Sequence, residues 1–229
     1  MLRFRELEAT ALYAGLGVQL IDEYASLPNT RDAPAIGPVT IELDIDEAGT
    51  WRPIDTAGHM QRRTPSGIVW FPWLEYHRDA RGLAPRKYRV RVSAPAYAPL
   101  YQWDSSGLEA LVYPYDNVEP PAGPASLLRA VLLPSAMYPF APDVPILRGV
   151  VTDAGTPVPE VLVYWTDATL RTDRVLTDAD GEFELPMRRA PPGPNPIFVA
   201  AETPFGGPSG DVPVRLPQDL PAFQTIQIS

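Results

Sequence analysis

Four aspartates in the C-terminal half have the residue type and spacing of a metal site. Asp178, Asp180 and Gly181 form an Asp-x-Asp-Gly turn, and Asp167 and Asp173 lie a few residues upstream. Carboxylate oxygens are the ligands that Ca²⁺ prefers, so this spacing could gather several of them around one ion. The chain lacks the twelve-residue loop that ends in a bidentate glutamate, and the same residues are typical of a tight hairpin turn. The sequence therefore favours a hairpin turn over a calcium site, and we expect no metal or other cofactor.

Nucleophilic and phosphate-binding chemistry has no recognisable motif in the chain. There is no cysteine, which excludes disulfides, thiolate metal sites and thiol catalysis. There is also no Gly-x-Ser-x-Gly nucleophile elbow and no glycine-rich phosphate loop, and Ser105-Ser106-Gly107 has the composition of a turn. We therefore expect no catalytic residues.

Aromatic residues gather near the middle of the chain and are the candidate binding residues. Successive residues of a strand point to opposite faces, so Trp70 and Phe71 cannot both lie in one core. Aromatic side chains anchor protein interfaces and also stack on sugars. We expect core packing to account for at least half of the set, and a protein interface in preference to a glycan site for the rest. The candidate interface residues are Trp70, Phe71, Trp73, Tyr76, Tyr97, Tyr101 and Trp103.

Charge and hydrophobic content exclude several classes of protein. The 229 residues carry 19 Lys and Arg against 28 Asp and Glu, a formal charge of −9, which argues against nucleic-acid binding. Hydrophobic residues make up 45%, too many for a disordered chain despite the 29 prolines. No run approaches the roughly eighteen apolar residues of a membrane span, and residues 1–8 lack the apolar centre of a secretory signal. We expect a folded protein made in the cytoplasm, without membrane insertion.

Strand patterns dominate, because prolines interrupt nearly every window long enough for a helix. The two helix candidates are residues 7–16 and 126–133. Segments that alternate apolar with polar residues, or form short β-branched and aromatic runs, recur at regular spacing. The strand candidates are 17–22, 39–44, 51–54, 67–71 and 88–93 in the first half and 146–153, 161–165, 174–177, 182–186, 197–201 and 223–228 in the second.

Residues 147–205 resemble the carboxypeptidase regulatory-like family. The likeness rests on residues 149–153, 157–159 and 161–163 and above all on 177–185, whose Asp-Gly pair supplies the geometry of a tight hairpin. The resemblance implies a transthyretin-type sandwich of seven strands. It also implies an accessory role in folding, adhesion or assembly, and it carries no chemistry with it.

The two halves of the chain follow one plan of strand, proline turn, strand and glycine turn, which suggests an internal repeat. We therefore predict an all-β protein with little helix, built of two tandem transthyretin-like or immunoglobulin-like β-sandwich domains. Residues 1–17 are predicted to form an N-terminal arm or edge strand and residues 18–118 the first domain. Residues 119–145 read as a proline-rich linker, and 146–229 as the second, carboxypeptidase regulatory-like domain.

Enzymes that share a related sandwich imply alternatives. Hydroxyisourate hydrolases end in a Tyr-Arg-Gly-Ser type tail, whereas this chain ends in Ile-Gln-Ile-Ser with no histidine nearby. Intradiol dioxygenases hold ferric iron with two tyrosines and two closely spaced histidines. That resemblance would assign Tyr76, Tyr88, His59 and His77, but the two histidines lie eighteen residues apart. We therefore predict a protein that is not an enzyme, with a dioxygenase-like iron enzyme as the least favoured alternative.

These features together predict a non-catalytic structural protein. The exposed edges of β-sandwiches can pair with strands of neighbouring chains, which is a route into an assembly. We expect a subunit of a multi-subunit particle, such as a phage tail with its baseplate or a contractile injection system, that joins a virion or virion-like particle. The expected partners are other protein subunits, further copies of this chain included. A glycan- or cell-surface-binding module is the alternative.

Overall fold

The computed structural model describes residues 15–26, 32–55, 62–100, 107–116, 126–167, 170–188 and 195–229, together with the single residues 123, 190 and 193. Nearly all of their regular structure is β-strand, which confirms the all-β prediction, and a 3₁₀ turn lies at Pro204–Gly206. No helix among the described residues is long and apolar enough to span a bilayer.

The chain forms two compact units, each assembled from several segments. Described residues of 15–22, 32–93 and 107–131 belong to the first unit, and those of 23–26, 94–100 and 132–229 belong to the second. The chain therefore passes from one unit to the other several times. A single linker at 119–145 does not describe this division.

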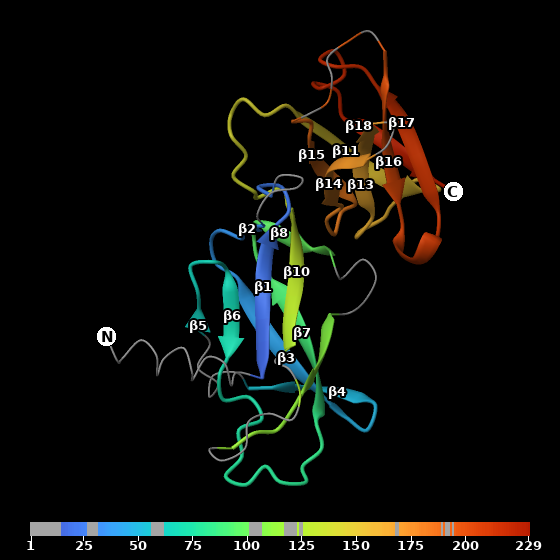
Figure 1. The fold of residues 1–229 in the computed structure, drawn as a ribbon. Helices are drawn as coiled ribbons and strands as arrows, with labels where there is room; N and C mark the ends of the chain where they lie inside the picture. The colour runs from blue at the N-terminus through green and yellow to red at the C-terminus, as the bar shows by residue number, and fades with distance from the viewer. Residues whose placement is uncertain are drawn as a thin grey trace. The chain divides into compact units, whose positions relative to one another are not determined.

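Two sheets build the first unit (Figure 1). One contains, in spatial order, β5 (Arg62–Arg63), β6 (Ile68–Phe71), β1 (Leu16–Asp22) and β10 (Ser126–Pro134), with β2 (Ala33–Pro34) also paired to β1. The other contains β4 (Thr50–Ile54), β3 (Thr40–Glu47), β7 (Arg86–Ser93) and β9 (Leu108–Val112), all antiparallel.

Sequence alternation explains the core of this unit. Leu43 and Ile45 of β3 and Val90 and Val92 of β7 are buried, whereas Glu42 on the opposite face of β3 is exposed. Side chains at every second position of a strand share one face, so these residues form a continuous apolar surface. The predicted strands at 39–44 and 88–93 are confirmed.

The second unit is a sandwich of two four-stranded sheets. In one, β11 (Ile146–Asp153) pairs with β12 (Thr156–Pro157), β15 (Glu182–Pro186) and, in parallel, β18 (Gln224–Ile228). The other has the order β14 (Leu170–Leu176), β13 (Leu162–Asp167), β16 (Ile197–Glu202) and β17 (Ser209–Val214). The core between the sheets includes Leu147, Val151, Trp165, Phe183 and Ile226.

A smaller apolar cluster covers the outer face of the β14-β13-β16-β17 sheet. Leu162, Tyr164 and Leu176 of that sheet pack with Leu133 at the end of β10, and Ala98 and Leu100 pack against this cluster. The end of β10 pairs with β8 (Tyr97–Pro99). The second unit therefore needs segments that precede residue 146, because they shield an apolar face of its sheet from water.

Residues 23–26 also belong to the second unit. Arg188 donates a 2.7 Å hydrogen bond from Nη1 to the carbonyl oxygen of Tyr24, and its guanidinium lies 4.1 Å from the centre of the Tyr24 ring. The Tyr24 ring packs edge-on against Tyr138 at 5.2 Å, and Tyr138 packs against Tyr97 at 5.5 Å. These contacts form an aromatic cluster from three separate stretches of chain.

Two sequence predictions fail in the region of β10. Residues 126–133 form a strand instead of the predicted helix, and they lie inside the predicted linker. Leucine, alanine and arginine favour helix locally, but pairing with neighbouring strands and burial of Ala130 and Leu132 override that preference. The other helix candidate, 7–16, and the predicted arm fall largely outside the described residues, and Leu16 begins β1.

Candidate binding site

The aromatic segment that ends β6 places its side chains in three different environments. Phe71 is fully buried in the core of the first unit. Trp70 is half-buried and its ring lies against Gly17, where an added Cβ would come within 2.7 Å of the indole atom Cζ3. Trp73 is 45% exposed and Tyr76 is half-buried. Trp73 is thus the residue of this segment most accessible to a partner.

The turn that carries Trp73 is held by residues far away in the chain. The Trp73 ring meets the Tyr76 ring edge-on at 5.7 Å, and Tyr76 meets Tyr115 at 5.6 Å. The hydroxyl of Tyr115 donates a hydrogen bond to the carbonyl oxygen of Pro72. The backbone N–H of His77 donates to the Tyr115 carbonyl at 2.9 Å, and the Tyr115 N–H donates to the carbonyl of residue 75 at 3.1 Å. These bonds fix the turn at both ends.

Glu75 lies at the centre of this turn in an unusual conformation. Its φ is 60°, in the left-handed region, and its side chain is only 2% exposed. One carboxylate oxygen accepts a hydrogen bond from the hydroxyl of Tyr88 and a longer contact of 3.5 Å from Arg86, and the other lies 2.9 Å from Nε2 of His77. A buried carboxylate is costly without such partners, and a left-handed residue other than glycine is strained by about 1–2 kcal/mol. The partners of Glu75 therefore select the shape of the turn.

Two tyrosine hydroxyls of this site stay protonated. Burial, and next the hydrogen bond to Glu75, raise the pKa of Tyr88 far above its usual value. Burial, and next the neighbouring Tyr76, raise the pKa of Tyr115 to about 12. Both hydroxyls therefore act as hydrogen-bond donors across the whole physiological range.

The predicted interface residues do not form one patch. Phe71 is core, and Tyr97 is buried in the second unit, so neither is available to a partner of the folded chain. Trp70, Trp73 and Tyr76 belong to the first unit, where the rings of Trp73 and Tyr76 are in contact and the Trp70 ring lies against Gly17. Tyr101 and Trp103 lie outside the described residues.

The residues considered for iron have other contacts. Tyr88 and His77 both bond to Glu75, and His59 lies outside the described residues. Within the part of the chain that the structure describes, no three His, Asp or Glu side chains lie close enough to hold a metal ion. The dioxygenase-like iron site stays a prediction.

Two of the aspartates considered for calcium have partners within the protein: Asp178 binds backbone N–H groups and Asp173 pairs with an arginine. Asp178 Oδ1 accepts N–H bonds from residues 180 and 182, at 3.0 and 2.9 Å. Asp173 is buried against Arg188 at 3.2 Å. The predicted hairpin at this point is wrong, since β14 and β15 belong to different sheets. The turn, with Gly181 at φ 72°, is a corner that carries the chain from one sheet to the other.

A charged face on the β4-β3-β7-β9 sheet was missed by sequence reasoning. Asp44 is buried beneath two arginines, with 2.7 and 2.9 Å bonds from Arg89 and two of 2.9 Å from Arg91. Burial raises the pKa of Asp44, but the hydrogen bonds from Arg91 and Arg89 outweigh it, and the pKa lies below its usual value. Arg89 also lies over the ring of Trp51 at 4.9 Å. The sequence signal for this face was the alternation of acidic residues along β3, such as Glu42 and Asp44, and of arginines along β7, Arg89 and Arg91.

Glu75 was missed as well, and nothing local marks it. Its carboxylate is buried, and two of its partners, Tyr88 and Arg86, come from β7 and reach it only in the folded chain.

Comparison with known proteins gives little. The chain matches no family model and no curated protein, so the resemblance of residues 147–205 to the carboxypeptidase regulatory-like family stays a prediction. Among solved structures the chain is similar to the Bacillus anthracis TIE protein, at 12% identity and a TM-score of 0.27. The match covers 93% of this chain and 32% of that protein, so this chain spans about a third of its length. A likeness of this size indicates neither a shared family nor a shared function.

Proposed function

We propose that this protein is a non-catalytic structural subunit that docks onto another protein through Trp73. The observation that supports this proposal is an indole 45% exposed to solvent on a turn whose backbone is fixed by the buried Glu75. A large side chain that is already held in place loses little conformational entropy when it binds, and such aromatic residues dominate binding energies at interfaces.

The exposed part of Trp73 is large enough to matter. An aromatic side chain buries about 150–250 Å² at most, so 45% of a tryptophan corresponds to roughly 110 Å². At about 25 cal/mol per Å², covering that area stabilises a complex by about 2–3 kcal/mol. This value is typical of an interface hot spot. His77 and Arg86, partly exposed and bonded to the same carboxylate, supply polar groups nearby.

The wider setting in this proposal is a multi-subunit particle, with a phage tail or a contractile injection system as the example. The β-sandwich architecture supports it, because sheets of this kind join assemblies readily by their edges and faces. A glycan-binding module is the second candidate, because the exposed ring of Trp73 could also stack on a sugar.

Site-specific photo-crosslinking tests the proposal. A photoreactive phenylalanine analogue replaces Trp73 in the cells that naturally produce the chain, and adducts are identified by mass spectrometry. The control carries the same analogue at Leu83, which is in the same unit and 47% exposed. We expect one discrete protein adduct from position 73 and none of that mass from position 83. An adduct of twice the chain mass would identify a second copy as the partner.

Binding to the purified partner then measures the contribution of the indole. Trp73→Ala should weaken the complex about 30- to 150-fold, which corresponds to 2–3 kcal/mol, and Leu83→Ala should change it less than threefold. No adduct at position 73, or the same adduct from both positions, would contradict the proposal. Strong hits on a glycan array that vanish with Trp73→Ala would support the second candidate instead.

A further inference from the structure

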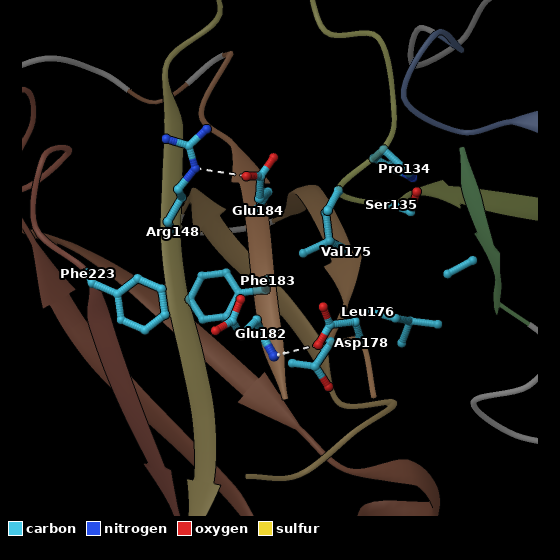
Figure 2. Close-up of a pocket in the computed structure, with 13 residues that line it drawn as sticks. Pro134, Ser135, Arg148, Val175, Leu176, Asp178, Glu182, Phe183, Glu184 and Phe223 are labelled. Atoms are coloured by element: carbon cyan, nitrogen blue, oxygen red, sulfur yellow. Dashed lines mark hydrogen bonds and ion pairs between the residues drawn. The ribbon is translucent and has the colours of Figure 1, made fainter. Parts of the chain in front are cut away.

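A pocket of about 140 Å³ opens beside the corner between β14 and β15 in the second unit (Figure 2). Its apolar lining includes three residues that are otherwise buried in the protein: Val175 and Leu176 of β14 and Phe183 of β15. Phe223, which directly precedes β18, also lines the pocket and is 56% exposed. The pocket thus combines an apolar base with an accessible aromatic ring.

The polar lining of this pocket is acidic. Arg148 is paired with Glu184, at 2.8 Å from Nε to Oε1. Asp178 and Glu182 also line the pocket, and no described residue forms an ion pair with either. Three carboxylates against one guanidinium leave two negative charges around a mainly apolar cavity. A bound anion would be repelled by them, whereas a bound cation would be attracted.

The walls are held in position before any ligand binds. On one side, the hydroxyl of Ser135 donates to the Pro95 carbonyl at 2.8 Å, and its N–H donates to the Ala96 carbonyl at 3.0 Å. On the other side, the side-chain amide of Gln224 closes the turn before Phe223, because its Nε2 donates to the carbonyl oxygen of Asp219 at 3.2 Å. A preformed pocket binds with less loss of entropy than one that must be ordered by its ligand.

We propose that this pocket binds a single lysine or arginine side chain of a partner protein. The aliphatic stem packs on Val175, Leu176 and Phe183, since long basic side chains bury their methylenes and keep the charge at the surface. The charged end meets Asp178 and Glu182, and the Phe223 ring adds a cation–π contact. The volume suits one side chain and is below the 300 Å³ or so at which drug-sized ligands are bound.

This pocket is independent of the Trp73 turn. It lies in the second unit, whereas Trp73 lies in the first, and the two sites share no residue. The proposal goes beyond the proposed function, and it stands or falls without reference to the crosslinking experiment.

Amide chemical shifts of the full-length chain test the proposal. The probe is Nα-acetyl-lysine amide, and its matched control is Nα,Nε-diacetyl-lysine amide, which keeps the stem and removes the charge. We expect shifts confined to residues 175–184 and 222–224, with a dissociation constant of the order of millimolar for so small a probe. The neutral analogue should bind at least fivefold more weakly, and added salt should weaken the lysine probe alone.

Two variants locate the charge that is responsible. Glu182→Gln should weaken lysine binding about threefold, as expected for a partly exposed ion pair. Glu160→Gln removes the same charge from an exposed position that does not line the pocket, and it should leave binding unchanged. Equal binding of both probes, equal effects of both variants, or no shifts in this region at tens of millimolar probe would each overturn the proposal.

Discussion

Replacing Leu133 with alanine tests whether the end of β10 is part of the second unit's core. Leu133 has no exposed surface and packs with Leu162, Tyr164 and Leu176 on the outer face of a sheet. Leucine-to-alanine changes in cores cost about 2–5 kcal/mol, depending on how far the cavity can collapse. Two members of this cluster keep 6–8% of their surface exposed, which leaves room for partial collapse, so we expect a loss of about 3 kcal/mol. The unfolding midpoint of this unit should fall by about 10–15 °C.

The matched control is Leu127→Ala on the same strand, where the leucine is 48% exposed. About half the apolar area is lost there and no closed cavity is left, so the cost should be below about 1 kcal/mol. Calorimetry of the full chain gives the midpoints, and hydrogen exchange of β13 and β14 shows whether the loss falls on the sheet opposite Leu133. If Leu133→Ala cost no more than Leu127→Ala, or if exchange in β13 were unchanged, the packing of Leu133 against the β13–β14 face would be refuted.

Three further changes probe single contacts. Gly210→Ala would place a Cβ 2.1 Å from the carbonyl oxygen of Gln227, so the free energy of unfolding measured in urea should fall by about 1–3 kcal/mol. Gly193→Ala, with open space around it, should change that free energy little. Asp44 has a lowered pKa, so the stability it contributes is present at neutral pH and is lost as the pH falls through about 4 and below. Asp44→Asn should therefore cost about 2–3 kcal/mol at pH 7, a value kept small because the paired arginines are partly exposed. The cost should decrease as the pH is lowered below about 4, as measured by urea unfolding at each pH. The pKa of Tyr115 is raised to about 12, so its contribution is complete below pH 10 and is lost as the pH rises toward 12, and Tyr115→Phe should flatten that part of the stability curve.

Much of the fold follows from alternation in the sequence. The strands at 39–44, 88–93 and 146–153 pair in long antiparallel or parallel registers, and most of their apolar residues are buried. Each of these segments is long enough for a period of two to be recognised, and each is flanked by glycine, proline or acidic turn residues. Existence and type of such strands are local properties, which is why they could be predicted.

Pairing between strands could not be read in the same way. The Asp178–Gly181 turn has the residues of a hairpin, yet it joins two sheets, because β14 pairs with β13 and β15 pairs with β11. The side chain of Thr177 helps to hold the corner, with its hydroxyl 2.9 Å from the N–H of Val161 and 2.8 Å from the Val158 carbonyl. Turn chemistry specifies how the backbone bends, and distant partners decide which sheet each strand then joins.

The candidate site divides along the same line. The aromatic residues were found because their type alone identifies them, and Trp73 proved to be the exposed one. Glu75 could not be found, because a glutamate after an aromatic run is ordinary until the fold brings Tyr88 and Arg86 of β7 to its carboxylate. Binding residues of distinctive composition can thus be predicted, whereas the residues that position them cannot.

The proline-rich segment 119–145 contains the last passage of the chain from the first unit to the second, but that passage runs through strand β10 and not through a linker. Proline lacks an N–H, and it is compatible with the end of a strand, as at Pro134 in β10. The apolar residues just before it, Leu132 and Leu133, are fully buried, which a solvated linker does not allow. A fragment that began at residue 146 would lose this cover and expose Leu162 and Leu176, at about 1.5–3 kcal/mol for each side chain. Against a typical domain stability of about 5–15 kcal/mol, that loss leaves the isolated C-terminal sandwich marginal, so the second unit depends on chain from both sides of the predicted linker.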